Sequence, residues 1–413
     1  MNAAKARAKG GDVPRAEHEL TLLKGGAALF PALVEAMDAA RSEVMLETYI
    51  FDFTRSALTV AEALERAAAR GVAVRVVVDG VGTGEIPPEW TRRWAAAGVR
   101  WRVFNPARGW RLLMPRGWRR LHRKLCVVDG RLAFCGGINL LDDFHDPNHG
   151  ALDEPRLDFA VRVRGPLVDD VHHTMTRLWW RLQTARKLRQ VDAEGALAAV
   201  RAVADAGVEE QTYSRRMGAG VRASLVLRDN FRFRRRIESV YRLAIAQARH
   251  EIVIANAYFV PGVTLQRALI RAARRGVKIT LLLQGRYEYF MQFHASHAMY
   301  GPMLAAGIEI IEYETSFLHA KVAVMDTPHG ALATVGSSNL DPFSLLLARE
   351  ANVFVRDDGF AAELMTHLRH AIGQQGRRVA PGAHARRSLL TRAANWIAYA
   401  GMRLMIMIAG KRY

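Results

Sequence analysis

At residues 63–80 the chain reads ALERAAARGVAVRVVVDG, and at residues 268–285 it reads ALIRAARRGVKITLLLQG. Each stretch combines a helix pattern, a glycine that can end the helix, and an aliphatic run that predicts a buried strand. A further apolar strand precedes each copy, at residues 43–51 and 251–259. Both halves therefore begin strand, helix, strand, which is typical of a layered α/β sheet.

The correspondence between the halves continues downstream. Residues 121–140 read LHRKLCVVDGRLAFCGGINL, and residues 318–340 read LHAKVAVMDTPHGALATVGSSNL. Residues 158–165, DFAVRVRG, likewise match residues 350–357, EANVFVRD. The longer stretch predicts two buried strands joined by a turn, and the shorter one a final strand. We therefore expect an α/β fold of two tandem domains, each a mixed β-sheet flanked by helices, related by pseudo-two-fold symmetry.

The extent of each copy predicts the domain boundaries. We expect a first domain at residues 1–190, a linker at 191–222, a second domain at 223–375 and a basic amphipathic C-terminal segment at 376–413. The linker is indicated by an alanine-rich helical stretch that runs into SRRMGAG. Duplicated α/β units imply no chemistry by themselves, so function depends on the residues that the copies share.

Composition limits the class of protein and of partner. The 413 residues are 50% hydrophobic, which suffices for packed cores, and the formal net charge of +19 suits nucleic acid or an anionic bilayer. Two cysteines in apolar runs favour a reducing compartment over a disulfide framework. Neither a signal peptide nor a segment of roughly 18 to 20 apolar residues is present, which predicts a cytoplasmic protein without a transmembrane anchor.

Three ionisable side chains recur at offsets 0, +2 and +7 in the two copies: His122, Lys124 and Asp129, and His319, Lys321 and Asp326. Alternation along a strand places the histidine and lysine of each copy on one face. Two imidazoles, each beside an ammonium, can bind a phosphodiester. One histidine can attack phosphorus while the other protonates the leaving alcohol, and the lysines can hold the non-bridging oxygens. The alternative is that duplication kept satisfied structural residues.

The doubled H-x-K-x4-D pattern resembles the phospholipase D superfamily over residues 20–375. More narrowly, LETYIF, the motif stretch at 121–140, IANAYFVPG and VGSSNLDPFS resemble the bacterial cardiolipin synthases. The lack of amino-terminal membrane helices makes the chain most similar to the shorter, peripheral type, cardiolipin synthase B. This resemblance implies that His122 forms a phosphohistidine and that His319 acts as acid and then as base, although the order could be reversed.

The resemblance also assigns supporting residues. Asn139 and Asn339 follow the motifs, where the family places polar groups on the phosphate. Asp158 and Glu350 begin equivalent strands, where the family uses carboxylates to orient the histidines. Asp129 and Asp326 are expected to support strand and turn. One departure is Ala348, where cardiolipin synthases usually carry asparagine, and this puts in doubt the details of the acidic support in the second half.

The resemblance implies no cofactor. No metal is expected, because the histidines lack a matching cluster of cysteine or carboxylate ligands and two lysines already supply positive charge. His294 and His297 stand three residues apart in the aromatic stretch at 285–301, which in the family helps to shape the cleft. Without a third ligand we interpret them as helix-surface or cleft residues.

The implied reaction makes cardiolipin and glycerol from two phosphatidylglycerol molecules. Alternatives are phospholipase D hydrolysis, a nuclease with the same core, and a membrane-binding scaffold without activity. Residues 101–124 interleave aromatic side chains with arginines, which suits stacked bases, an anionic bilayer or a solvated basic loop. Residues 388–408 predict a helix with a basic stripe and a broad apolar face, which favours a membrane interface over docking on the protein's own core.

The expected partners are therefore phosphatidylglycerol and other anionic phospholipids at the inner-membrane surface, on its cytoplasmic face, rather than nucleic acid.

Overall fold

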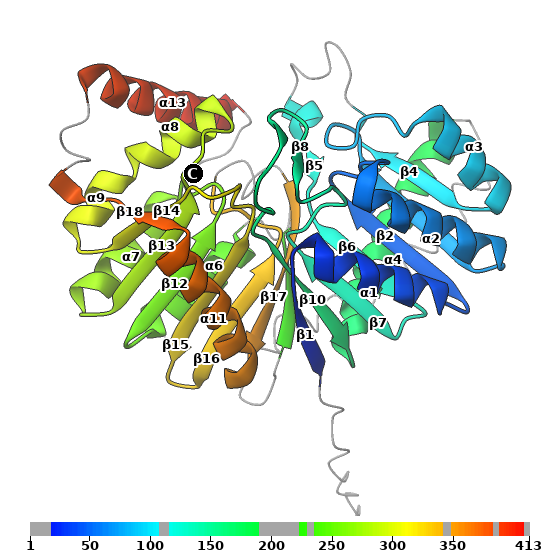
Figure 1. The fold of residues 1–413 in the computed structure, drawn as a ribbon, viewed down its shortest axis with the longest axis horizontal. Helices are drawn as coiled ribbons and strands as arrows, with labels where there is room; N and C mark the ends of the chain where they lie inside the picture. The colour runs from blue at the N-terminus through cyan, green and yellow to red at the C-terminus, as the bar shows by residue number, and fades with distance from the viewer. Residues whose placement is uncertain are drawn as a thin grey trace, which may run out of the picture.

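A computed structural model describes residues 18–106, 115–189, 223–228, 235–341, 348–382 and 388–408. It contains two α/β halves that lie side by side, the first coloured blue to green and the second green to red (Figure 1). The predicted linker, residues 191–222, lies outside the described residues, so its boundaries stay a prediction.

The first half is built on a seven-stranded mixed sheet. Its strand order is β1 (Glu19–Lys24), β10 (Phe159–Arg164), β7 (Leu132–Gly136), β6 (Lys124–Val128), β2 (Glu43–Thr48), β3 (Ala73–Asp79) and β4 (Arg100–Phe104). Strands β2, β3 and β4 are parallel, and the other neighbours are antiparallel. The outer face packs against α1 (Gly25–Asp38), α2 (Leu58–Ala69) and α3 (Pro88–Ala97).

The second half repeats this arrangement in a nine-stranded sheet. Its order is β11 (Ala223–Arg228), β17 (Ala348–Arg356), β16 (Gly330–Gly336), β15 (Lys321–Thr327), β12 (Glu251–Asn256), β13 (Lys278–Gln284), β14 (Glu309–Tyr313) and β18 (Gly376–Arg378). The ninth strand, β5 (Arg120–Leu121), comes from the first half and pairs with β17. The outer helices are α6 (Arg236–Gln247), α7 (Val263–Arg274), α8 (Phe290–Ala298) and α9 (Tyr300–Ala305).

The predicted helix-to-strand repeat is confirmed in both halves. Helices α2 and α7 bury their apolar faces and are followed by Gly71 and Gly276, whose φ angles of 89° and 90° favour glycine. Strands β3 and β13 then run into the two sheets. The edge strands β1 and β11 were not predicted, because neither falls in the stretches that match between the copies.

One hydrophobic core lies between the two sheets and joins the halves. It contains strand residues from both sheets together with α4 (Leu167–Arg189) and α11 (Asp358–Gln374). Helix α4 of the first half contacts β11, and α11 of the second half contacts β1. Helices α4 and α11 therefore each pack against the opposite half, and this packing fixes the relative position of the two halves.

Several smaller elements and a C-terminal helix complete the fold. A small hairpin pairs β8 (His145–Asp146) with β9 (Gly150–Ala151), and η3 (Pro115–Trp118) precedes β5, while η1 (Arg55–Ala57) leads into α2. The C-terminal helix α13 (Leu389–Ile408) packs on α8 (Figure 1). None of the helices that the structure describes combines the length and apolar character needed to cross a bilayer.

Candidate active site

The two motif histidines stand at the junction of the halves. Strands β6 and β15 begin at Lys124 and Lys321, so the prediction that each histidine lies on the strand with its lysine is wrong. The backbone N–H of His122 donates to Arg349 O at 3.0 Å, and that of His319 donates to Leu157 O at 2.9 Å. Each histidine therefore leaves its own sheet because its backbone is bonded to the opposite half.

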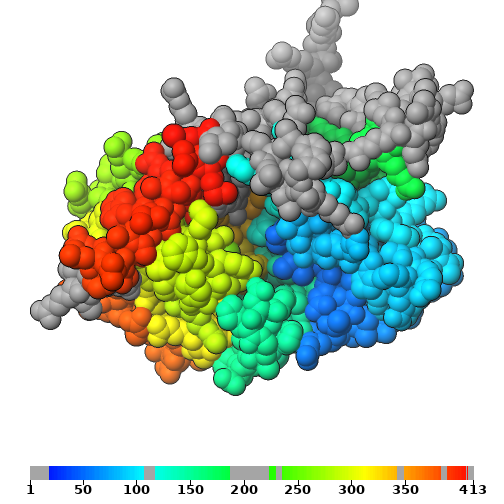
Figure 2. Space-filling view, turned by 90° about the horizontal axis from the view of Figure 1, so that it is seen from above, coloured from blue at the N-terminus to red at the C-terminus, as the bar shows by residue number. Residues whose placement is uncertain are grey.

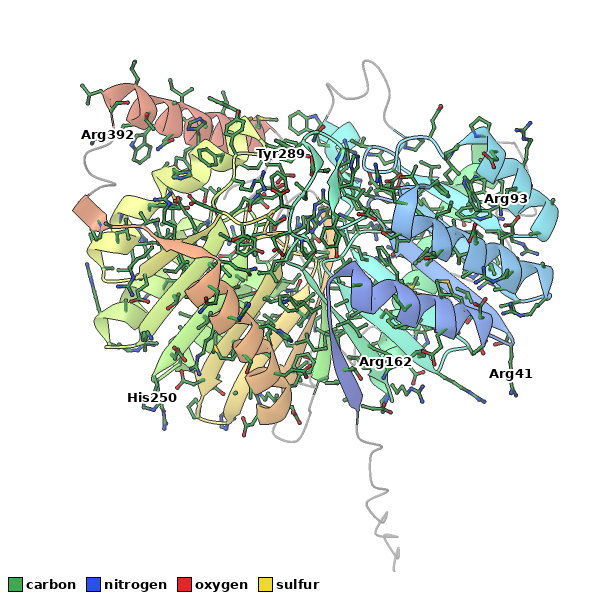
Figure 3. The ribbon with its side chains drawn as sticks, viewed as in Figure 1. Arg41, Arg93, Arg162, His250, Tyr289 and Arg392 are labelled. Carbon is green, nitrogen blue, oxygen red and sulfur yellow. The ribbon has the colours of Figure 1, made fainter. Side chains whose placement is uncertain are left out.

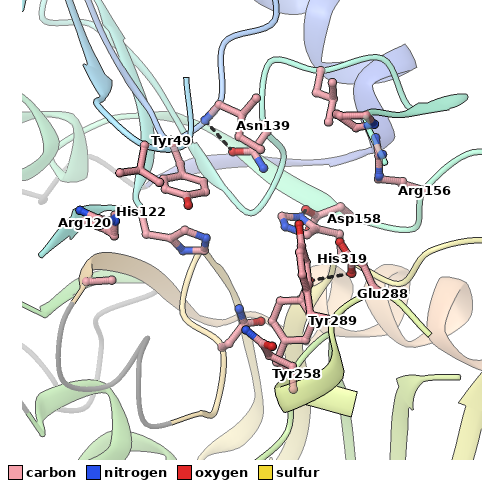
Figure 4. A pocket seen from close by; sticks show the side chains of 18 of the residues that line it. Tyr49, Arg120, His122, Asn139, Arg156, Asp158, Tyr258, Glu288, Tyr289 and His319 are labelled. Atoms are coloured by element: carbon pink, nitrogen blue, oxygen red, sulfur yellow. Dashed lines mark hydrogen bonds and ion pairs between the residues drawn. The ribbon is translucent and has the colours of Figure 1, made fainter. Parts of the chain in front are cut away.

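Both histidines line one cavity of about 660 Å³. Asn139, Asn339 and Asp158 line it as well, and Figure 4 shows the His122 and His319 rings approaching it from opposite sides. The two copies of the motif thus contribute to a single site.

Each imidazole is held by a carboxylate of the opposite half. Nδ1 of His122 lies 3.0 and 3.1 Å from the two carboxylate oxygens of Glu350, and Nδ1 of His319 lies 2.6 Å from Asp158 Oδ2. Because Nδ1 is occupied in both rings, Nε2 is the nitrogen available to a substrate. Ser337 Oγ donates to Glu350 at 2.5 Å and so helps to fix that carboxylate.

Close packing around Asp158 depends on the glycines of GGIN. An added Cβ at Gly137 would collide with the Asp158 carboxylate. Only glycine leaves room for the carboxylate beside this turn.

Burial and positive neighbours tune the acid–base groups. Burial, followed by the charges of Lys321 and Lys124, holds the pKa of His319 well below its usual value. Burial also lowers the pKa of His122. The two carboxylates differ: burial raises the pKa of Asp158 to about 7, whereas at Glu350 the effect of burial is outweighed by interactions with His122 and Lys124, which lower the pKa.

The motif lysines lie behind the histidines rather than on the cavity wall. Lys124 Nζ donates to His122 O at 2.7 Å, and Lys321 Nζ donates to His319 O and lies 3.9 Å from Asp158 Oδ2. Burial lowers their pKa values to about 7 and about 8. Neither lysine lines the cavity, so direct contact with a phosphate stays a prediction.

The asparagines lie where polar groups for a phosphate were expected. Asn139 Oδ1 accepts a hydrogen bond from Ile50 N at 3.2 Å, which turns its amide N–H groups toward the cavity (Figure 4). Asn339 is buried and lines the same cavity after β16. Their binding of phosphate stays a prediction.

Asp129 and Asp326 do not line the cavity. Asp129 accepts hydrogen bonds from the backbone of residues 41–43, and Asp326 accepts them from residues 249–251. These contacts fix the turns that enter β2 and β12, at the ends of β6 and β15 remote from the histidines. Asp129 and Asp326, grouped with the catalytic motif in the sequence, therefore support strand and turn, as expected.

The match to known proteins is found in both halves. The family model described as "Cardiolipin synthase, PLD-like domain" matches residues 33–152 and 241–372. The chain is also 35% identical over 363 residues to cardiolipin synthase B of Escherichia coli (strain K12), covering 86% of this chain and 80% of that one. The chain belongs to the cardiolipin synthase family of the phospholipase D superfamily. Family membership makes it a phosphatidyltransferase.

Other relatives agree with this assignment. Cardiolipin synthase A of Pseudomonas aeruginosa (strain LESB58) is 29% identical, covering 86% of this chain and 66% of that one. Among solved structures, phosphatidylserine synthase of Haemophilus influenzae Rd KW20 has the same fold, with a TM-score of 0.65 at 11% identity and 94% of each chain covered. Polyphosphate kinase from Porphyromonas gingivalis matches with a TM-score of 0.55 at 15% identity, covering 93% and 53%.

Several cavity residues were not predicted as site residues in this cardiolipin synthase family member: Tyr49, Arg120, Arg156, Tyr258, Glu288 and Tyr289. Arg156 lies in residues 141–157, a segment that is longer than its counterpart between Asn339 and β17. Glu288 and Tyr289 lie in YEYF, which has no match in the first copy. The signal that could have found them is the difference between the copies.

His294 and His297, the two histidines of the aromatic stretch at 285–301, form hydrogen bonds within the protein. His294 Nδ1 lies 2.7 Å from Asn395 Oδ1, and His297 Nε2 lies 3.0 Å from Glu312 Oε1. Across the described ranges, no three histidine, cysteine, aspartate or glutamate side chains gather in a way that could hold a metal ion.

Proposed function

We propose that the protein transfers a phosphatidyl group from one phosphatidylglycerol to another and releases cardiolipin and glycerol. The observation that carries this proposal is the pair of imidazoles in one cavity, each oriented by a carboxylate of the opposite half. The similarity to cardiolipin synthases B and A supports cardiolipin as the product.

In the first step, Nε2 of His122 attacks phosphorus and the bond from phosphorus to the glycerol oxygen breaks. His319 gives its proton to that oxygen, so glycerol leaves as a neutral alcohol. The low pKa of His122 keeps its ring neutral and nucleophilic, and the Glu350 carboxylate holds the proton on Nδ1. The negative phosphodiester favours the charged form of His319 when the substrate is bound.

In the second step, His319 accepts the proton of a hydroxyl group on the second phosphatidylglycerol. The hydroxyl oxygen attacks phosphorus, the phosphorus–nitrogen bond breaks, and His122 is regenerated. We expect Asn139 and Asn339, which line the cavity, to donate to the non-bridging oxygens. The buried ammonium groups behind both rings add positive potential where negative charge develops.

Helix α13 supports action at a lipid surface, which we propose to be the cytoplasmic face of the bacterial membrane. It docks on α8 through buried Asn395, Ala398 and Met402. The helical pattern puts Asn395 on the predicted basic stripe with Arg392 and Arg403. Part of this stripe therefore faces the protein, so the docking alternative holds for this side of the helix. The opposite side exposes six large apolar side chains: Leu389, Leu390, Trp396, Ile397, Leu404 and Met407.

This exposed face is a surface suited to the interface of an anionic bilayer. Helix α13 forms a ridge over the second half (Figure 2). Arg392 and Arg403 are exposed on the same helix, and no carboxylate side chain follows Glu363 in the sequence. Apolar area beside positive charge favours anionic lipid. Met405 of α13 lines the cavity, so a bilayer that covers the helix lies next to the cavity.

Defined vesicles test the proposed reaction. Purified protein is incubated with phosphatidylglycerol vesicles and, separately, with labelled single-stranded DNA, and products are measured by mass spectrometry and gel electrophoresis. We expect cardiolipin and glycerol in equal amounts and intact DNA. Phosphatidic acid without cardiolipin would identify a hydrolase, and cleaved DNA with unchanged lipid would identify a nuclease.

A further inference from the structure

The cavity differs chemically between its two histidines. Near His122, Figure 4 shows Tyr49 and Arg120, and the cavity wall also contains Ile50, Val81 and Trp118. Near His319 it shows Tyr258, Glu288 and Tyr289, and the lining there includes carboxylates. Burial raises the pKa of both Glu288 and Asp158, and the negative charges of Asp146 and Asp143, respectively, add to this effect.

Glu288 is the carboxylate of this wall with an oriented and accessible side chain. Tyr258 Oη donates to Glu288 Oε2 at 2.6 Å. Within the described part of the chain, Tyr258 is the only hydrogen-bond partner of this carboxyl group, which leaves Oε1 for a ligand in the cavity. Tyr289 packs edge-to-face on Tyr258 with ring centroids 6.3 Å apart and limits its movement.

The backbone holds this pair on neighbouring parallel strands. Tyr258 follows the carboxyl end of β12, and Glu288 follows the carboxyl end of β13. Side chains at the carboxyl ends of adjacent parallel strands converge, and ligands of open α/β sheets bind there. The sheet therefore fixes the positions of Tyr258 and Glu288, although both residues lie in loops.

The ligand that fits this wall carries hydroxyl groups. A phosphate is repelled by carboxylates, and an acyl chain gains nothing from them. A hydroxyl group donates well to a carboxylate oxygen, and such a bond is stronger than one between neutral groups. The part of the substrate next to His319 in the proposed reaction is the glycerol that leaves, and later the glycerol headgroup that attacks.

We propose that Glu288, oriented by Tyr258, binds the free hydroxyl groups of the leaving glycerol and of the attacking headgroup, and thereby selects polyol acceptors. This inference rests on the proposed function. It assigns Glu288 a specificity role and leaves the bond-making steps to the histidines.

Competition between alcohols tests the inference. Phosphatidylglycerol vesicles are incubated with deuterated glycerol and ethanol at equal concentration, and labelled phosphatidylglycerol and phosphatidylethanol are measured by mass spectrometry. We expect the wild type to favour glycerol, and Glu288→Ala to lower the glycerol-to-ethanol ratio by about tenfold, the loss of one charge-assisted hydrogen bond. Tyr258→Phe should lower the ratio by about threefold, and Glu288→Gln should keep part of the preference. The KM for vesicles should stay within about twofold.

Glu363→Gln, on the exposed face of α11, is the matched control and should leave the ratio unchanged. An unchanged ratio in both Glu288→Ala and Tyr258→Phe overturns the inference, and Tyr258→Phe decides the matter if Glu288→Ala does not fold. The same competition is also run with ethanolamine as an acceptor. If Glu288→Gln reduces transfer to ethanolamine and leaves transfer to glycerol unchanged, the inference is overturned, because the wall would then bind an ammonium group. A wild type that transfers to no alcohol defeats the proposed function itself.

Discussion

The two halves place the same side chains around the cavity but surround them differently. His122 is paired with Glu350, whose pKa is lowered, and His319 is paired with Asp158, whose pKa is raised to about 7. Arg120 stands near His122, whereas Glu288 and Arg156 stand near His319. Duplication thus supplied two equivalent imidazoles, and divergence around them allows one to act as nucleophile and the other as acid and base.

The pairing between halves also explains why neither half can form the site alone. Each histidine depends on the opposite half for its carboxylate and for the carbonyl group that holds its backbone. The charged groups are distributed over the whole structure (Figure 3), yet these crossed contacts bring only a few of them to the cavity.

The largest expected effect separates the two histidines. His122→Ala should reduce cardiolipin formation by at least about ten-thousand-fold, because the nucleophile is lost. His319→Ala should reduce it by about a thousand-fold with phosphatidylglycerol. With a p-nitrophenyl phosphodiester, whose leaving group needs no proton, His319→Ala should recover its first step and His122→Ala should not. Release of p-nitrophenolate in the first turnover measures this; the opposite pattern would reverse the two roles.

The next effect separates the two carboxylates. Glu350→Gln should lower the transfer rate by about a hundredfold, since an ionised partner that orients the nucleophile is lost. Asp158→Asn should cost about tenfold, because Asp158 with a pKa of about 7 is partly protonated at neutral pH. Steady-state kinetics on phosphatidylglycerol vesicles compare them. Equal losses would mean that the halves are electrostatically equivalent.

The same carboxylate predicts a pH dependence of stability. The folded protein raises the pKa of Asp158 from 3.8 to about 7, so the stability contributed by its protonated form is present below about pH 4 and is lost as the pH rises through 7. Asp158→Asn cannot ionise. The melting temperature of this variant minus that of the wild type should therefore be larger at pH 8 than at pH 5. A difference that does not change between these pH values would contradict the raised pKa.

Helix α13 allows a comparison of its two faces. Trp396→Ser combined with Ile397→Ser should weaken binding to anionic vesicles by at least about tenfold and leave the melting temperature unchanged, because both side chains are exposed. Asn395→Ala, on the face toward α8, should lower the melting temperature instead. Vesicle sedimentation and thermal unfolding distinguish the two. Unchanged vesicle binding in the double variant would exclude the apolar face as the lipid contact.

The smallest effect concerns the turn residues. Asp129→Asn and Asp326→Asn should each reduce the free energy of unfolding by about 1 kcal/mol, since they weaken hydrogen bonds at largely exposed turns. The kcat for transfer should not change. Denaturant unfolding and steady-state rates give both quantities. A large fall in kcat with intact stability would indicate that these residues act directly in catalysis.

The repeat in the sequence predicts the sheets well because it repeats the same local patterns. It does not predict that β5, just before His122, joins the sheet of the opposite half. Without that contact between the halves, each histidine was expected to lie on the strand of its own lysine. The partners of the two histidines were expected at Asp158 and Glu350, but which carboxylate serves which ring depends on how the halves face each other.

The rest of the site comes from places where the copies differ. Arg156 and Glu288 lie in segments without a counterpart in the other half, so repeat matching has no means of finding them. The helical pattern of α13 was predicted correctly, but a pattern of apolar and polar positions does not reveal which face meets the protein. Asn395 faces α8 because His294 offers it a hydrogen bond there.

The central claim is that the two imidazoles act on one phosphorus atom and that His122 becomes covalently phosphorylated. Rapid quenching of His319→Ala with the p-nitrophenyl phosphodiester, followed by proteolysis at alkaline pH and mass spectrometry, tests it directly. We predict a phosphoryl adduct on the peptide that contains His122, absent from His122→Ala. The absence of an adduct on His122, while p-nitrophenolate is released at the full rate, would contradict the account.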